Sequence, residues 1–514
     1  MNALAATSSP LATLAALDIL RQGGTAADAA VCASALMCVT EPHMTGIGGD
    51  CFCIVGQEDG SVEGLNASGR SSVRATEEWL AGANLSSIES SSVHSVTVPG
   101  AVDGWQVLLE RYGKMDLSAL LQPAIKAAEE GVAITPRVAH DWALLTGKLS
   151  ADEGGRAHYL VGGKAPVAGE RHAVPALARS MRLIAEGGRD AFYTGEIAED
   201  ITSVVAGHGG LLTVDDFAAT SADWVEPIST SWMGSDILEI PPNGTGLTAL
   251  IALNILKNFD LSAFPADSVE RIHLQTEAMR LAFVARNRHI ADPEFSDIPI
   301  DELLSEEFAH QVAAEISLER AIPEPENAVP QPGSDTVYLT VVDENRMAVS
   351  FINSIFDSFG SGIVTPRTGI ILQSRGHGFV TQPGHPNCIG PSKRPLHTII
   401  PSMMMQNGKV TMPFGVMGGP YQPMGHVQVV VNMYVYGMDI QEALDFPRFY
   451  PEQGILSLES GIPNHVMAAL AEKGHKVART EAPLGGGQGI VIDHANGSLC
   501  GGSDPRKDGC ALGY

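Results

Sequence analysis

The chain has 514 residues and a formal net charge of −27 at pH 7. Because phosphate neutralisation requires clustered Lys and Arg, this charge argues against a nucleic-acid-binding protein. Hydrophobic residues make up 44% of the chain, which is typical of a globular protein and excludes a disordered or fibrous one.

The cysteine content and the N-terminus predict a cytoplasmic protein. The seven cysteines have neither zinc-site nor thioredoxin spacing, which favours reduced thiols. No basic residue precedes Arg21, so we expect no signal peptide. The longest apolar run, residues 29–39, is too short to span a bilayer, and we therefore expect no membrane partner.

Two helices are predicted near the N-terminus, at residues 11–22 and 25–39. A glycine-rich loop at 46–49 leads into a predicted strand at 51–55. This loop precedes a strand instead of opening a helix, so we do not interpret it as a dinucleotide-binding motif.

The middle of the chain contains predicted strands within residues 213–242 and predicted helices at 247–256 and 269–289. Residues 320–335 are rich in Pro, Glu and Asn and have no periodicity, which predicts an accessible linker. The charge balance changes at the same place. From Thr336 onward there are 12 basic and 13 acidic residues, against 20 and 46 before it.

A hairpin is predicted directly after this linker. Thr336 opens an alternating strand to residue 342, a turn follows at 343–345, and residues 347–352 form the return strand. Further strands are predicted at 368–373 and 410–416, and a helix at 422–436. Taken alone, a Thr at the start of a strand is structural, because β-branched residues fit the pleat.

The motifs around this hairpin resemble one known family. Gly-Ser-Asp-Thr precedes it, Phe-Gly-Ser-Gly follows it, and Met417-Gly418-Gly419 comes later. Together they resemble the gamma-glutamyltranspeptidase family of N-terminal-nucleophile hydrolases. The resemblance covers nearly the whole chain and implies an α+β fold, a four-layer αββα sandwich.

The resemblance also implies that the precursor cuts itself between Asp335 and Thr336. Residues 1–335 then form a large subunit and residues 336–514 a small subunit, and the two make one fold as a heterodimer. Whether two such units associate into a dimer stays open.

The implied chemistry explains why a Thr stands at this position. In the cut protein Thr336 is the nucleophile, and its freed α-amino group, with an ordinary pKa of about 7.7–8.0, is the base. By resemblance, Ser354 supplies a second hydroxyl that supports the nucleophile. Gly418 and Gly419 match the glycine pair whose backbone N–H groups form the oxyanion hole.

Substrate recognition is assigned by resemblance to residues that bind a carboxylate. Arg70 is the candidate for a bidentate clamp, with Arg74 as its competitor. His397 and Thr398 occupy the place of two serines that help to hold the carboxylate, although His397 is also open to interpretation as a core histidine.

One region departs from the family pattern. Phe356, Arg375 and Gly378 stand where transpeptidases recognise the α-amino group of a glutamyl substrate. Because an Arg cannot bind a cation, we expect Arg375 to bind a second anionic group, or the substrate to lack the amine.

The implied function is hydrolysis or transfer of an acyl group through an acyl-Thr intermediate, with gamma-glutamyl compounds such as glutathione as first choice. Oxamate amidohydrolases and glutaryl-cephalosporin acylases resemble the chain at the same motifs and are the alternative. A catalytically inactive binding protein is a third reading, disfavoured by the intact Asp-Thr and Gly-Gly motifs.

The expected partner is a small molecule that carries a carboxylate, and no cofactor or metal is expected. His377, His385 and His397 are separated by prolines and glycines, unlike the histidines of a zinc helix.

Overall fold

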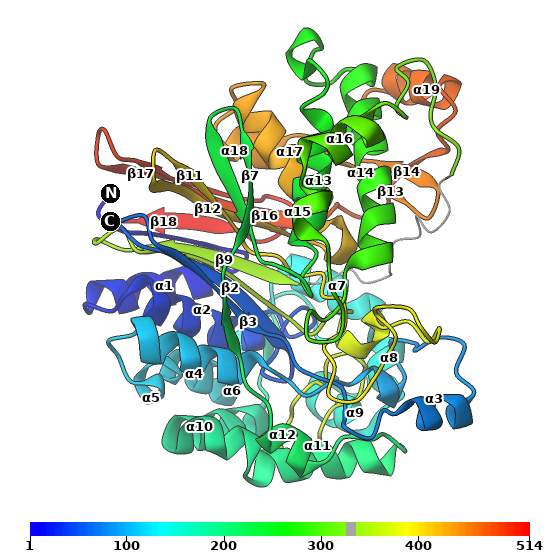
Figure 1. The fold of residues 1–514 in the computed structure, drawn as a ribbon. Coiled ribbons are helices and arrows are strands. Elements are labelled where there is room, and N and C mark those ends of the chain that lie inside the picture. Colours follow the sequence, from blue (N-terminus) through cyan, green and yellow to red (C-terminus); the bar gives the residue numbers. More distant parts are fainter. Residues whose placement is uncertain (325–335) are drawn as a thin grey trace.

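The computed structural model describes residues 1–324 and 336–514 of the chain. Two antiparallel sheets lie face to face at its centre, and helices cover the outer face of each sheet (Figure 1). Each sheet therefore buries one face against the other sheet and one against helices. This helix–sheet–sheet–helix order confirms the expected αββα sandwich of the α+β class.

The first sheet mixes strands from before and after Thr336. Its order is β18 (Cys510–Gly513), β1 (Leu4–Thr7), β9 (Val337–Val342), β10 (Ala348–Ser354), β2 (Asp50–Gly56), β3 (Val62–Ala67) and β6 (Asp223–Val225). The β9–β10 hairpin occupies its middle, with Leu339 opposite Phe351. Both termini lie at one end of this sheet (Figure 1), where the Tyr514 N–H donates to the Ala3 carbonyl at 3.2 Å.

The second sheet also combines segments from both parts of the chain. Its order is β17 (Ser498–Ser503), β16 (Gly486–Asp493), β12 (Lys409–Met417), β11 (Ser402–Gln406), β8 (Ser235–Glu239) and β7 (Ile228–Trp232). The β9 strand packs across on β12 and β16. Because the two sheets share strands from both parts of the chain, neither part contains a complete fold by itself.

Helices of the first layer lie on the outer face of the first sheet (Figure 1). They are α1 (Pro10–Arg21), α2 (Ala26–Thr40) and α4 (Ala101–Tyr112), with α5 (Leu117–Leu120), α6 (Gln122–Glu130) and α10 (Pro175–Tyr193) packed behind them. The small side chains of the alanine-rich α2 allow it to pack closely on β9 and β10.

Helices of the fourth layer cover the second sheet. They are α13 (Gly246–Leu256), α14 (Val269–His289), α16 (Glu306–Ala313), α17 (Gln422–Tyr434) and α18 (Ile440–Asp445). Of these, α13, α17 and α18 contact the strands directly, while α14 and α16 pack on α13.

Shorter elements surround the sandwich. They are α3 (Glu77–Ala83), α7 (Pro136–Leu144), α8 (Thr146–Ser150), α9 (Glu153–Tyr159), α11 (Glu196–Gly207), α12 (Val214–Ala218), α15 (Ile300–Leu303), α19 (Asn464–Glu472), β4 (Val132–Ala133), β5 (Arg171–His172), β13 (Phe449–Glu452), β14 (Ile455–Leu458) and β15 (Val477–Arg479), with 3-10 turns η1 (Val93–Ser95), η2 (Leu261–Ala263), η3 (Arg375–Gly378) and η4 (Gly419–Tyr421).

Most predicted elements are present, and two predictions are wrong. Thr213 does not open a strand, because it forms a capping box with Asp216 and starts α12. Residues 368–373 form no regular strand, since Gly369 has a φ of 68° and the segment makes only the isolated bridge between Val364 and Ile371. Regular strands are therefore shorter than predicted in residues 213–232 and absent from residues 368–373.

All seven cysteines lie among the described residues, and none of them forms a disulfide. In the same part of the chain, no helix combines the length and the apolar character that crossing a membrane requires.

Candidate functional site

Thr336 lies immediately before β9, and its side chain is almost completely buried, with 1% of the residue exposed. Its Oγ1 donates to Ser354 Oγ at 3.3 Å and accepts a hydrogen bond from Gln422 Nε2 at 3.4 Å. Ser354 ends β10, and the hairpin register places Asn353 opposite Val337. The hairpin itself therefore brings the two hydroxyls together.

Arg375 extends this hydroxyl network. Its Nη2 donates to Ser354 Oγ at 3.1 Å and its Nη1 to Thr398 Oγ1 at 3.0 Å. The guanidinium carbon lies 4.2 Å from the centre of the Phe356 ring. Thr336, Ser354, Arg375 and Thr398 therefore form one continuous hydrogen-bonded chain.

The backbone at Phe356 shapes the floor of the site. Its φ of 78° is rare for a bulky residue, and its N–H donates to Ser354 Oγ at 2.9 Å. Left-handed backbone two residues after the end of β10 places the ring against the Arg375 guanidinium. Such strained positions are concentrated at functional sites.

The positive charge of Arg375 has neutral groups as its hydrogen-bond partners. Its side chain is completely buried, and its Nε is without a hydrogen-bond partner within residues 1–324 and 336–514. Burial lowers the pKa of the guanidinium to about 9, although the charges of Asp50 and Asp357 oppose this shift. A buried cation held by neutral hydroxyls is electrostatically suited to an incoming anion.

His397 points away from this network and into the core. Its Nε2 lies 3.1 Å from Asp50 Oδ2, its Nδ1 accepts from the Ile399 N–H, and its ring packs 4.6 Å from that of Phe52. Burial, reinforced by the charge of Arg375, lowers the pKa of His397 to about 3, so the ring is neutral. Of the two readings that the sequence left open, the geometry favours the core histidine.

Gly418 and Gly419 follow the end of β12 and have φ values of 123° and 56°. A Cβ on Gly418 would lie 2.9 Å from the Gly485 Cα, so the turn leaves no room for a side chain there. The η4 turn then leads directly into α17, whose first residue is Gln422. One short segment therefore carries both the glycine pair and the amide that contacts Thr336.

Arg70 is held elsewhere. Its guanidinium donates to Asp292 at 3.3 Å, to Glu294 at 2.6 Å and to the Ser392 carbonyl at 3.1 Å. Two carboxylates thus already neutralise its charge. Arg74, the competitor, is exposed. Asp335, the other half of the expected cleavage site, lies outside the described residues.

Two polar residues of the site, Asp50 and Gln422, were not predicted from the sequence. Asp50 accepts hydrogen bonds from the Gly69 and Gly100 N–H groups and from Gln373 Nε2 at 2.9–3.0 Å, in addition to its contact with His397. Gln422 holds Thr336 from α17, and its Oε1 accepts from Ile400 N–H at 3.0 Å. A polar residue in the first turn after a glycine pair is the only local signal for Gln422.

One cluster offers metal-ligand atoms away from the hydroxyl network. The ligand atoms of His273, Glu277 and His475 lie within 4.8 Å of one another. His273 Nδ1 is only 2.7 Å from His475 Nε2, which is a hydrogen bond and closer than two tetrahedral zinc ligands come. Arg280 donates to the Glu277 carboxylate at 2.8 Å. The cluster is therefore better explained as a hydrogen-bonded clamp than as a metal site.

Comparisons with known proteins identify the family of the chain. A family model described as gamma-glutamyltranspeptidase matches residues 12–514. The glutathione hydrolase-like YwrD proenzyme of Bacillus subtilis (strain 168) is 38% identical over 98% of this chain and 97% of its own. The oxamate amidohydrolase proenzyme of Klebsiella pneumoniae subsp. pneumoniae is 34% identical, again over 98% of this chain and 97% of its own.

A solved structure shares the whole fold. The cephalosporin acylase from Bacillus halodurans superposes with a TM-score of 0.94 and 40% identity, covering 100% of this chain and 96% of that protein. The structural match covers both sheets and all four layers, and the two sequence matches each cover 98% of this chain. A buried Thr at the head of β9, a glycine pair after β12 and full-length similarity lead to the same result: the chain belongs to the gamma-glutamyltranspeptidase family of enzymes.

Proposed function

We propose that the protein is a self-processing amide hydrolase whose nucleophile is Thr336. The observation that carries this proposal is the Thr336 hydroxyl, buried at the start of β9 between Ser354 Oγ and Gln422 Nε2. A cut between Asp335 and Thr336 frees the α-amino group that a Thr nucleophile needs as its base. Residues 1–335 and 336–514 then remain together as a heterodimer, because both sheets contain strands from each part.

The reaction follows from these groups. The α-amino group of Thr336 accepts the hydroxyl proton while Oγ1 bonds to the amide carbon of the substrate. The N–H groups of Gly418 and Gly419 receive the oxyanion, an arrangement worth about 3–4 kcal/mol per donor in known enzymes. The C–N bond then breaks and the proton passes to the leaving amine. Water hydrolyses the acyl-Thr ester and regenerates the hydroxyl, or an acceptor amine takes the acyl group.

Arg375 selects the acyl group in this proposal. The guanidinium is buried, its hydrogen-bond partners are neutral, and its Nε, which has no hydrogen-bond partner among the described residues, is able to donate to a carboxylate. The Arg375 guanidinium occupies the face of the Phe356 ring and repels an ammonium group placed beside it. We therefore favour an acyl group that carries a carboxylate and lacks the α-amine, as in amides of short dicarboxylic acids. The oxamate amidohydrolase and cephalosporin acylase relatives are compatible with this class.

A gamma-glutamyl substrate is the second candidate, and one residue favours it. Asp357 follows Phe356, accepts from Ser374 Oγ at 3.0 Å and is close enough to Arg375 to raise its pKa. A carboxylate at this position is able to pair with the glutamyl ammonium group. The glutathione hydrolase relatives support the same substrate.

We also propose a cytoplasmic location, on the grounds that all seven cysteines are free thiols and that no disulfide stabilises the fold. No metal or cofactor takes part in the proposed reaction.

A direct comparison of two chromogenic amides tests the proposal. We expect purified, cut enzyme to hydrolyse glutaryl p-nitroanilide with a higher kcat/KM than gamma-glutamyl p-nitroanilide, because an unpaired ammonium next to Arg375 is unfavourable. Thr336→Ala should be inactive on both. A strong preference for the glutamyl compound would assign the amine to Asp357, and activity in Thr336→Ala would remove the nucleophile.

A further inference from the structure

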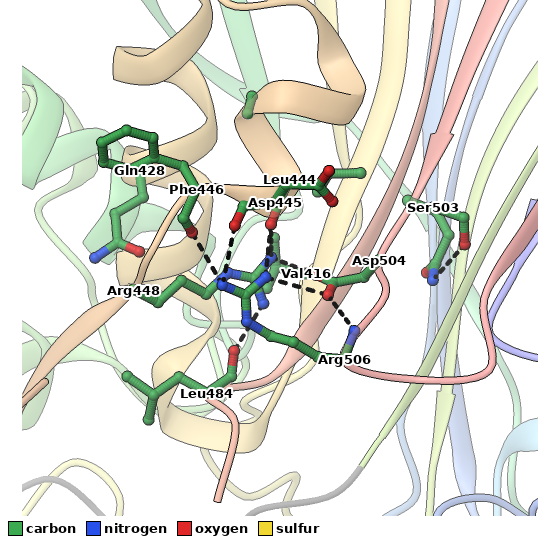
Figure 2. A network of polar contacts seen from close by, with 12 residues as sticks. Val416, Gln428, Leu444, Asp445, Phe446, Arg448, Leu484, Ser503, Asp504 and Arg506 are labelled. Atoms are coloured by element: carbon green, nitrogen blue, oxygen red, sulfur yellow. Dashed lines mark hydrogen bonds and ion pairs between the residues drawn. The ribbon is translucent and has the colours of Figure 1, made fainter. Parts of the chain in front are cut away.

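Four charged side chains form a buried network beside the second sheet. They are Arg448, Glu459, Asp504 and Arg506, which we call the charge tetrad. Arg448, Glu459 and Asp504 are at most 8% exposed. Figure 2 shows the guanidinium groups of Arg448 and Arg506 converging near Asp504 and beside the Leu484 carbonyl. With two positive and two negative groups, the charge tetrad is neutral as a unit.

The charge tetrad binds both backbone polar groups of Leu484. The Leu484 N–H donates to Glu459 Oε1 at 3.0 Å, and its carbonyl accepts from Arg448 Nη1 at 2.7 Å. Arg506 fixes Glu459 in turn, through Nε at 2.7 Å and Nη2 at 2.6 Å. Although burial opposes the shift, these contacts lower the pKa of Glu459, which keeps it ionised. Leu484 is therefore clamped without belonging to a strand.

The next residue, Gly485, lies against the glycine pair of the site. It has a φ of 66°, and a Cβ on it would lie 2.2 Å from the Met417 carbonyl oxygen. From the other side, a Cβ on Gly418 would lie 2.9 Å from the Gly485 Cα. The β12–β16 ladder ends at Met417 opposite Gly486, so no ladder hydrogen bond fixes the backbone beyond it.

A second contact connects the charge tetrad to the same turn. The guanidinium carbon of Arg448 lies 5.8 Å from the centre of the Tyr421 ring. Tyr421 ends η4, and its ring carbon would lie 2.9 Å from a Cβ on Gly485. Gly485 thus packs against both ends of the turn, Gly418 and Tyr421. Arg448 contacts the Leu484 carbonyl, next to Gly485, and also the Tyr421 ring.

We propose that the charge tetrad is a positioning device for the oxyanion hole. Two adjacent glycines with positive φ have many accessible conformations, and oxyanion donors act only when their direction is fixed in advance. The Leu484–Gly485 segment, held by directional hydrogen bonds to charged groups, supplies that constraint. A buried ion pair is weak evidence for stability compared with apolar packing, and the effect that we assign to the charge tetrad is the directional constraint on Leu484. The inference rests on the oxyanion role of Gly418 and Gly419 under the proposed function.

Arg448→Lys is the main test, since a Lys keeps the charge but loses the planar fork that reaches Leu484 and Asp504 together. We expect kcat on the preferred anilide to fall about tenfold to a hundredfold, while KM stays within about twofold. Inhibition by 4-boronobutanoic acid, which forms a tetrahedral adduct on a nucleophilic hydroxyl, should weaken by the same factor as kcat. Gly485→Ala should lower kcat and weaken boronate inhibition in the same way, because its Cβ would displace the Met417 carbonyl next to Gly418.

The matched control is Arg189→Lys. Arg189 pairs with the buried Asp103 and donates to the Thr220 carbonyl from α10, behind the first layer of helices. Melting temperatures of all variants are measured on cut enzyme, and Arg189→Lys should retain wild-type kcat. Wild-type kcat in both Arg448→Lys and Gly485→Ala, or an equal loss in Arg189→Lys, would overturn the inference. So would a loss of kcat with unchanged boronate inhibition. If instead the proposed function were wrong, Thr336→Ala would keep its activity.

Discussion

Arg375 Nη2 lies 3.1 Å from Ser354 Oγ, and this contact places a buried positive charge one hydroxyl away from Thr336, the proposed nucleophile. The same Ser354 oxygen accepts the hydrogen of Thr336 Oγ1 at 3.3 Å. Under the proposed function, a single guanidinium is therefore in a position to attract an acyl carboxylate and, through Ser354, to polarise the Thr336 hydroxyl.

We expect the chain to cut itself between Asp335 and Thr336. Intact-mass analysis of fresh protein should show two fragments, residues 1–335 and 336–514. Thr336→Ala should stay a single chain, because it lacks the hydroxyl that attacks the preceding carbonyl. A fully active single chain, or cutting in the Ala variant, would contradict the mechanism.

Changing Arg375 should impair hydrolysis of the substrate more than self-cleavage of the chain. We expect Arg375→Ala to lower kcat/KM at least about a hundredfold, since charge-assisted hydrogen bonds to a buried carboxylate are lost. Arg70→Ala should have a smaller effect, because Asp292 and Glu294 already neutralise Arg70. Steady-state kinetics on both anilides and gel analysis of processing measure the two effects. Unchanged kinetics in Arg375→Ala would remove it from the site.

Gln422 should contribute to catalysis without binding the acyl carboxylate. Its Nε2 donates to Thr336 Oγ1, so Gln422→Ala removes a neutral hydrogen bond worth about 1 kcal/mol, or about fivefold in kcat. KM should change little. The exposed Gln311 on α16 provides a matched control, Gln311→Ala. An equal kcat in both variants would show that the contact has no catalytic effect.

Acid should destabilise the folded chain through its buried histidines. Burial lowers the pKa of His397 and of His475 to about 3, with the charge of Arg375 adding to the shift in His397. The unfolded chain binds these protons below about pH 6.5 while the folded chain does not. The free energy of unfolding should therefore be unaffected by these histidines above pH 6.5. Between pH 6.5 and pH 3 it should fall by up to about 1.4 kcal/mol per pH unit for each histidine.

Thermal melts of uncut Thr336→Ala between pH 7 and pH 4 measure this effect. Adding His475→Asn should reduce the dependence on pH, whereas His465→Asn, at an exposed position of α19, should not. The same slope with and without His475 would exclude it as a source of the acid sensitivity.

The sequence alone determined the features that depend on neighbouring residues. Alternation from residue 337 onward predicted the β9–β10 hairpin, and its register necessarily brings Ser354 close to Thr336. The positive φ values of Gly418 and Gly419 are likewise a local property, visible as adjacent glycines after a strand. These motifs also carried the family resemblance, and hence the sandwich fold.

Only the tertiary structure decided where distant side chains point. His397 and Thr398 are adjacent in sequence, yet one donates to Asp50 in the core and the other accepts from Arg375. Arg70 is neutralised by Asp292 and Glu294, which lie 222 and 224 residues further along the chain. No local sequence pattern encodes such a pairing. The choice between such partners depends on which charges are buried together, and burial is a property of the packed layers and not of any single segment.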